Sequence, residues 1–225
     1  MERHIVGLGG GGDTAEQTRL LNDYVLGVVG KERPRMLWVP TAVGDDPSVG
    51  VSFSEAFATR ADVRPLPTFP WPPPDVRELI LQQDAICVCG GNTANMLAIW
   101  RVHGIDRYLH EAWEAGVVLW GQSAGMICWF EAGVTDSFGP HLDGMECLGF
   151  LPGSACPHYD GEIERRPRYR ELVDGGFAAG VAADDGVALH YVGTELVEAV
   201  TCRPGASAYR VSRDGEQRIE TRELA

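Results

Sequence analysis

The strand, turn and helix pattern around Ser123 constrains this 225-residue chain more than any other feature. The apolar run at 117–120 includes two valines and predicts a buried strand, and residues 126–130 predict a helix. Gly121 and Gly125 flank the serine with the Gly-x-Ser-x-Gly spacing of a nucleophile elbow, which needs small residues because the helix passes close to the strand. The alternative is a plain strand–turn–helix junction without catalytic meaning.

Strands and helices alternate along the first half of the chain. We expect strands at 4–8, 36–39, 62–66, 85–89 and 117–120, and helices that include residues 20–28, 53–60, 75–83, 96–100 and 108–113. The first helix has capping-box spacing at Asp13 and Glu16, and the tail from Leu196 predicts two antiparallel strands that turn at 213–215. This alternation predicts an α/β three-layer sandwich with a mostly parallel sheet, one domain over residues 1–225, and a site at the carboxyl ends of the strands.

The composition excludes several classes of function. The formal net charge is −13, which argues against nucleic acid or an anionic membrane as partner, because both require a basic surface. The N-terminus lacks a signal-peptide pattern and no run approaches the ~20 apolar residues of a membrane span, so we expect a cytoplasmic protein. The cysteines lack zinc-type spacing and predict mostly buried free thiols, so no metal is expected. We expect no cofactor either: Gly7, Gly9 and Gly12 fit a dinucleotide fingerprint, but no ribose-binding acid follows the second strand.

A catalytic serine needs a base and an acid that orients the base. His158 follows a predicted strand and is the favoured base, and His141 in a Gly-Pro loop is a weaker candidate. Asp185, at another strand end before Gly186, is the favoured acid. Three further aspartates compete with it: Asp136, Asp160 and Asp184.

A second glycine pair follows the strand at 85–89. Gly90 and Gly91 precede Asn92, a residue suited to capping the next helix, so backbone amides there can approach a ligand closely. The N–H groups of Gly91 and Ala124 are therefore candidate oxyanion donors.

These motifs together resemble the dipeptidase E (aspartyl dipeptidase) and cyanophycinase family of serine peptidases. The resemblance rests on Gly90-Gly91-Asn92, Gly121 to Gly125, Pro157-His158 and Asp184-Asp185-Gly186, in this order, and extends from the first glycine-rich loop to about Leu189. It implies the fold of class I glutamine amidotransferases, with Ser123 as nucleophile, His158 as base and Asp185 where the founding aspartyl dipeptidases have glutamate. An acid placed soon after the nucleophile would correspond to Asp136 instead. The order serine, histidine, aspartate argues against an α/β-hydrolase.

The resemblance also suggests a substrate. Arg165 and Arg168 match an arginine pair that could face the carboxylate of an N-terminal aspartate, with Asn92 and Gln122 as further substrate contacts. The alternative for the arginines is pairing with Glu162, Glu164 or Glu171 along the helix. We expect hydrolysis of short peptides, with Asp-x dipeptides as candidates. The alternatives are a cyanophycinase-like β-aspartyl peptidase and a non-catalytic binding protein. A homodimer is a candidate assembly for each of these functions.

Overall fold

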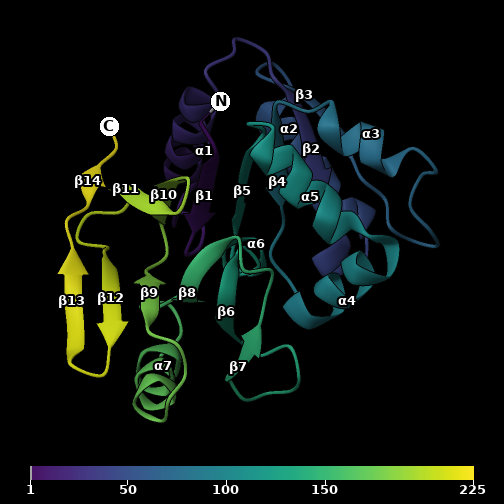
Figure 1. Cartoon of the computed structure of the whole chain (residues 1–225). Coiled ribbons are helices and arrows are strands. Elements are labelled where there is room, and N and C mark those ends of the chain that lie inside the picture. The colour runs from purple at the N-terminus through teal and green to yellow at the C-terminus, as the bar shows by residue number, and fades with distance from the viewer. Residues whose placement is uncertain (1) are drawn as a thin grey trace.

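The computed structural model describes residues 2–225, which form two β-sheets with helices around them (Figure 1). The larger sheet has eight strands in the order β14-β11-β10-β1-β5-β4-β2-β3. Their bounds are β1 His4–Leu8, β2 Arg35–Val39, β3 Asp62–Pro65, β4 Ala85–Val88, β5 Val118–Gln122, β10 Val187–Val192, β11 Glu195–Thr201 and β14 Arg222–Glu223. The five strands from β1 to β3 pair in parallel and β10 joins them antiparallel, which confirms the expected mostly parallel sheet.

Helices cover this sheet as the alternation predicts. They are α1 Ala15–Val29, α2 Pro47–Phe57, α3 Val76–Leu81, α4 Thr93–His103 and α5 Ile105–Glu114, with a short 3-10 turn at Thr41–Val43. Helix α5 packs against both α3 and α4, and these three helices lie on the side of the sheet nearer the viewer in Figure 1. The capping box of α1 is made by Thr14 and Gln17, one residue later than predicted, because the Thr14 hydroxyl accepts from the Gln17 amide.

The segment after Ser123 differs from the expected helix. Helix α6 spans only Ala124–Ile127, and the chain then enters strand β6, Phe130–Thr135. Strand β6 is buried at all but one position and pairs with β7 on one side and β8 on the other. Sheet pairing therefore outweighs the local helical pattern of this apolar segment.

The second sheet was not predicted. It has six strands in the order β13-β12-β9-β8-β6-β7, with β7 Asp143–Glu146, β8 Leu151–Cys156, β9 Gly180–Ala183, β12 Ala208–Ser212 and β13 Gly215–Ile219. Helix α7, Arg165–Asp174, packs against β12 and β7. The hairpin at 213–215 is confirmed, but its first strand is β12. The strand that contains Leu196 is β11 and lies in the larger sheet.

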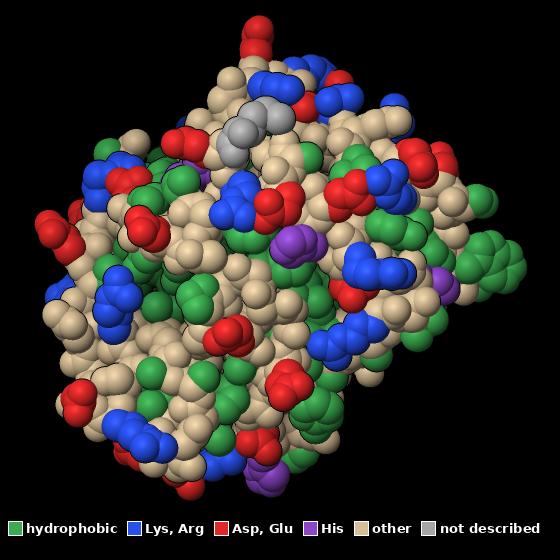
Figure 2. Space-filling model, viewed as in Figure 1, with side chains coloured by type: hydrophobic (Ala, Val, Ile, Leu, Met, Phe, Trp, Pro, Cys, Tyr) green, Lys and Arg blue, Asp and Glu red, His purple; other side chains and the backbone are tan. Residues whose placement is uncertain are grey.

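All six cysteines are buried and free, as the sequence predicts. Burial raises the pKa of the Cys156 thiol to about 12, so this cysteine is a poor nucleophile. Within residues 2–225, no helix has the length and apolar character needed to cross a bilayer. Figure 2 shows acidic and basic side chains interspersed over one face of the molecule.

Candidate active site

Ser123 occupies a tight turn between β5 and α6. Its φ is 55° and its ψ is −112°, a sparsely populated backbone conformation for a residue with a side chain. A Cβ atom on Gly121 or Gly125 would lie 2.2 or 2.1 Å from the carbonyl oxygen of Val88. The two glycines therefore let the turn pass against β4, as the sequence predicts.

His158 and Asp185 form a hydrogen-bonded pair next to this turn. His158 follows β8, and Asp185 lies in the turn between β9 and β10. His158 Nδ1 is 2.6 Å from Asp185 Oδ1, and about a quarter of each side chain is exposed. Because an ionised carboxylate only accepts, Nδ1 carries the proton. Within residues 2–225 Nε2 makes no hydrogen bond, so it remains available as an acceptor.

Strand β1 holds the serine and the histidine side by side. The Ser123 amide donates to the Leu8 carbonyl and the His158 amide donates to the next carbonyl, that of Gly9, each at 3.1 Å. His158 has a φ of 52° and therefore also sits in a strained turn. No hydrogen bond joins the two side chains in the described part of the chain. The larger sheet contributes the serine, the second sheet contributes the histidine, and β1 joins them.

The glycine-rich loop at residues 9–12, directly after β1, packs closely against His158 and Asp185. A Cβ atom on Gly10 would lie 1.8 Å from Asp185 Oδ1 and 2.9 Å from His158 Nδ1. One on Gly9 would lie 2.4 Å from the Asp184 carbonyl oxygen. These glycines serve close packing of the loop against the histidine–aspartate pair.

Two residues hold the backbone of Asp185 from both sides. The Asp185 amide donates to Asp160 Oδ1 at 2.9 Å, and Arg203 Nη1 donates to the Asp185 carbonyl oxygen at 2.7 Å. Arg203 also pairs with Asp160 Oδ2 at 3.0 Å and with Asp13 at 3.1 Å. Asp160 was a competing acid in the sequence, whereas no sequence signal pointed to Arg203, 18 residues away from Asp185.

The other candidate acids lie elsewhere. Asp184 is buried and accepts from the Ser207 amide at 2.8 Å, and burial raises its pKa to about 6. Asp136 is exposed just after β6, next to Ser137, whose hydroxyl accepts from the first amide of α4. Of the aspartates at 136, 160 and 184, only Asp160 accepts a hydrogen bond from Asp185, the partner of His158. His141, the weaker base candidate, lies on the loop before β7 near Arg168.

The predicted oxyanion donors adjoin the serine turn: Ala124 follows Ser123, and Gly91 follows Gly90, on which a Cβ would lie 3.4 Å from Ser123 Cβ. Gly91 has a φ of 135°, and a Cβ there would lie 2.4 Å from the Ala42 carbonyl oxygen. Ala124 is the first residue of α6, where an amide N–H has no acceptor within the helix. Asn92 caps α4: its Oδ1 accepts from the Asn95 amide at 2.9 Å, and its Nδ2 donates to the Ser137 carbonyl oxygen at 3.0 Å.

The two arginines predicted to contact substrate have partners within the protein. Arg165 is 4% exposed, pairs with Glu162 at 2.7 Å and donates to the Val134 carbonyl oxygen. Arg168 pairs with Glu171 and Asp143 and donates to the Leu142 carbonyl oxygen. The Gln122 side chain, in contrast, is exposed at the serine turn, and a Cβ on Gly11 would lie 3.9 Å from its Oε1.

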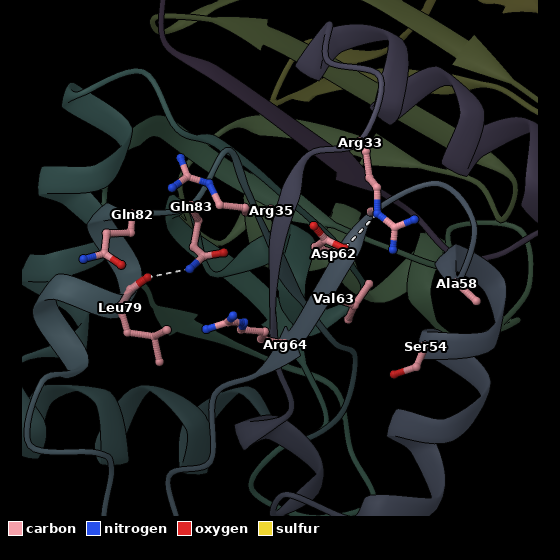
Figure 3. Close-up of a pocket in the computed structure, with 11 residues that line it drawn as sticks. Arg33, Arg35, Ser54, Ala58, Asp62, Val63, Arg64, Leu79, Gln82 and Gln83 are labelled. Carbon is pink, nitrogen blue, oxygen red and sulfur yellow. Dashed lines mark hydrogen bonds and ion pairs between the residues drawn. The ribbon is translucent and has the colours of Figure 1, made fainter.

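A cavity of about 670 Å³ lies away from these residues, along β3 and the end of α3 (Figure 3). Arg33, Arg35 and Arg64 line it, and Arg33 pairs with Asp62 across it at 2.8 Å. None of the predicted site residues reaches this cavity. The candidate site therefore lies at the carboxyl edge of the parallel strands, as predicted.

Comparison with known proteins assigns the chain to a family. Residues 5–199 match peptidase family S51. The uncharacterized peptidase YgaJ of Bacillus subtilis (strain 168) is 47% identical over 213 residues, which cover 93% of this chain and 92% of that protein.

Two crystal structures share the fold. A peptidase from an acI-B1 Actinobacterium superposes with a TM-score of 0.75 at 18% identity, covering 98% of this chain and 95% of that one. A putative peptidase E protein from Listeria monocytogenes EGD-e superposes with a TM-score of 0.65 at 15% identity, covering 98% and 100%. At such low identity these structures support the amidotransferase-like fold alone. The sequence match over most of the chain confirms the resemblance to dipeptidase E and cyanophycinase, and we conclude that the chain belongs to peptidase family S51.

Proposed function

We propose that this protein is a serine peptidase that hydrolyses short peptides through an acyl-enzyme formed on Ser123. The observation that carries the proposal is the 2.6 Å hydrogen bond from His158 Nδ1 to Asp185, beside a serine in a strained strand-to-helix turn. A nucleophile elbow with an oriented histidine base is what serine acyl transfer requires.

The geometry supports one assignment of roles. Asp185 holds the imidazole with its proton on Nδ1, so Nε2 can accept the Ser123 hydroxyl proton as Oγ attacks the peptide carbonyl carbon. The imidazolium then gives this proton to the departing amine as the C–N bond breaks. Water attacks the resulting ester with the same histidine as base, which releases the acid and restores the serine.

The oxyanion of each tetrahedral intermediate needs hydrogen-bond donors. The donors we propose are the amides of Ala124, next to Ser123, and of Gly91, next to Gly90, on which a Cβ would lie 3.4 Å from Ser123 Cβ. Because backbone amides in tight turns are fixed before substrate arrives, they need little reorganisation during the reaction.

The proposed substrate class rests on the relatives and on the contacts of Arg165 and Arg168. The relative from Bacillus subtilis is described only as a peptidase, and the Listeria structure as a putative peptidase E. Hydrolysis of Asp-x dipeptides requires a cation facing the aspartate carboxylate, and Arg165 and Arg168 are engaged by protein carboxylates. We therefore propose short peptides as the substrate class and treat Asp-x as one member to be tested.

The decisive experiment is hydrolysis of a peptide panel by the wild type and Ser123→Ala in parallel, with products identified by mass spectrometry. The panel holds Asp-x and other dipeptides, N-blocked peptides and a β-aspartyl-arginine peptide. Cleavage of dipeptides that is lost in the variant supports the proposal, and cleavage only of β-aspartyl-arginine would favour a cyanophycinase-like activity. Absence of both hydrolysis and Ser123 labelling by a fluorophosphonate would favour a non-catalytic binding protein.

A further inference from the structure

A second cavity, of about 290 Å³, is lined in part by Gln122, the residue before the proposed nucleophile. Its lining also includes Leu8, the last residue of β1, Cys89, the residue after β4, and Gly11 of the glycine-rich loop after β1. Because Gln122 immediately precedes Ser123, the cavity reaches the carboxyl edge where the peptide carbonyl would bind. Its volume is at the lower end of the range for small-molecule sites, about 300–1,000 Å³.

Aromatic rings form the walls of this cavity. Trp38 and Trp120 project from β2 and β5, and Phe53 and Phe57 project from α2. The ring of Phe53 stacks on Trp38 at 5.6 Å and lies 6.0 Å from Trp120. An apolar or aromatic ligand group here would exchange water for ring contacts.

Two polar side chains of the cavity lining bear on its ligand: Trp120 Nε1 is fully buried without a partner within residues 2–225, and Asn22 lies on the opposite element, α1. Asn22 of α1 is 8% exposed, and its amide makes no hydrogen bond within residues 2–225. It lies one helical turn beyond Thr18, whose hydroxyl accepts from Gly12, so it sits deeper than the glycine loop. The Asn22 side chain can therefore form a hydrogen bond with a polar atom at the far end of a ligand in this cavity.

The lining contains no charged residue. Neither Asp, Glu, Lys, Arg nor His is among the side chains that bound the cavity. A carboxylate placed there would lose its hydration without gaining a counter-charge, which is strongly unfavourable. The cavity therefore disfavours the aspartate side chain that the family resemblance suggests.

We propose that this cavity is the acyl-side specificity pocket and that it takes an uncharged aromatic side chain, with tyrosine the best match. The acyl residue is the one whose carbonyl carbon Oγ attacks, so in this proposal its side chain enters the cavity lined by Gln122, next to Ser123 in the chain. The rings accept the aromatic body and Asn22 meets the hydroxyl. This inference rests on the proposed serine peptidase function and adds its substrate preference.

The test compares kcat/KM for Tyr-Ala, Phe-Ala, Ala-Ala and Asp-Ala with the full chain. We expect the aromatic dipeptides to exceed Ala-Ala by at least about ten-fold, because even one methylene in a hydrophobic pocket changes kcat/KM by about 10–200-fold, and we expect Asp-Ala to be the poorest. Ser52→Phe fills the cavity from α2 and should remove most of the aromatic advantage, measured as the ratio of kcat/KM for Tyr-Ala to kcat/KM for Ala-Ala. Ser54→Phe, on the same helix but outside this cavity, is the matched control.

The outcomes separate this inference from the proposed function. Hydrolysis of Asp-Ala or Ala-Ala as fast as Tyr-Ala, or an equal effect of Ser52→Phe and Ser54→Phe, would overturn the pocket assignment and keep the serine mechanism. Fluorophosphonate labelling of Ser123 without aromatic dipeptide hydrolysis would also overturn it. No labelling and no hydrolysis of any dipeptide would overturn the proposed function itself.

Discussion

Within residues 2–225, two histidine–carboxylate assemblies use similar residues but hydrogen-bond their imidazoles differently. One is His158 with Asp185 at the carboxyl edge of the parallel strands. In the other, His190 of β10 contacts His4 at 3.0 Å and the Tyr24 hydroxyl at 2.8 Å, and Tyr24 donates to Glu198. The two assemblies differ in whether an imidazole nitrogen remains without a hydrogen bond.

His190 uses both ring nitrogens inside the protein. Because Tyr24 donates to Glu198, its oxygen accepts from His190 Nδ1, and Nε2 then accepts from His4 Nδ1. His158 uses only Nδ1 in a hydrogen bond within residues 2–225, which leaves Nε2 available as an acceptor. A histidine with a carboxylate partner therefore becomes a base only where one nitrogen is left unbonded next to a nucleophile.

Ser123→Ala should cause the largest effect. The variant loses Oγ, the proposed nucleophile, which has no counterpart in the His190 assembly. We expect kcat/KM to fall by about 10⁴-fold or more, because the other triad members contribute little without the nucleophile. Thermal unfolding should be nearly unchanged, because alanine has the same backbone requirements. Full retention of activity would show that another residue is the nucleophile.

His158→Gln should lower kcat/KM almost as much as Ser123→Ala, because the serine loses its base. His190→Gln is the matched change in the other assembly and should leave kcat/KM within about three-fold, since it lies outside the site. Peptide hydrolysis under identical conditions compares the two. Equal losses in both variants would contradict the separation of roles.

Asp185→Asn should lower kcat by about 10²–10⁴-fold, because an amide no longer fixes the productive imidazole tautomer. Asp136→Asn, which changes the alternative acid, should lower kcat by less than about three-fold, since this residue is exposed beyond β6. Steady-state kinetics of the two variants decides between the acids. A larger loss in Asp136→Asn would reassign the acid.

Arg203→Met should lower kcat by about ten-fold, because Asp185 loses one of the two contacts that hold its backbone. Arg203 is a positioning residue, so its effect should disappear in an Asp185→Asn background, as a double-mutant cycle would measure. Independent, multiplicative losses would show that Arg203 acts elsewhere.

The smallest effect should be a pH dependence of stability. Burial, with His4 as second cause, lowers the pKa of His190 to about 4, below the usual 6.5. As pH falls from about 6.5 to 4, the unfolded chain binds a proton that the folded His190 resists, so the free energy of unfolding should fall by up to about 3 kcal/mol.

Denaturant unfolding at several pH values measures this loss. His190→Gln should reduce it, and His158→Gln should retain it. An unchanged pH dependence in His190→Gln would assign the effect to other groups.

The sequence by itself determined the parallel part of the fold and the identity of the serine turn. Alternating apolar runs and caps are local signals, and Gly121 and Gly125 predict a turn that the structure contains because only small residues fit against β4. His158 and Asp185 were also identified from the sequence as residues at strand ends, and the structure brings them into contact.

Only the tertiary structure decided what depends on contacts between distant segments. The second sheet arises because β6 and β8 pair across a long connection, which no local pattern encodes. Tertiary structure likewise placed Arg203 on the Asp185 carbonyl, engaged Arg165 and Arg168 with protein carboxylates, and left Asn22 facing an aromatic cavity. The sequence determines the chemistry of each side chain. The packing of the whole chain determines which of its polar atoms remain without a hydrogen bond.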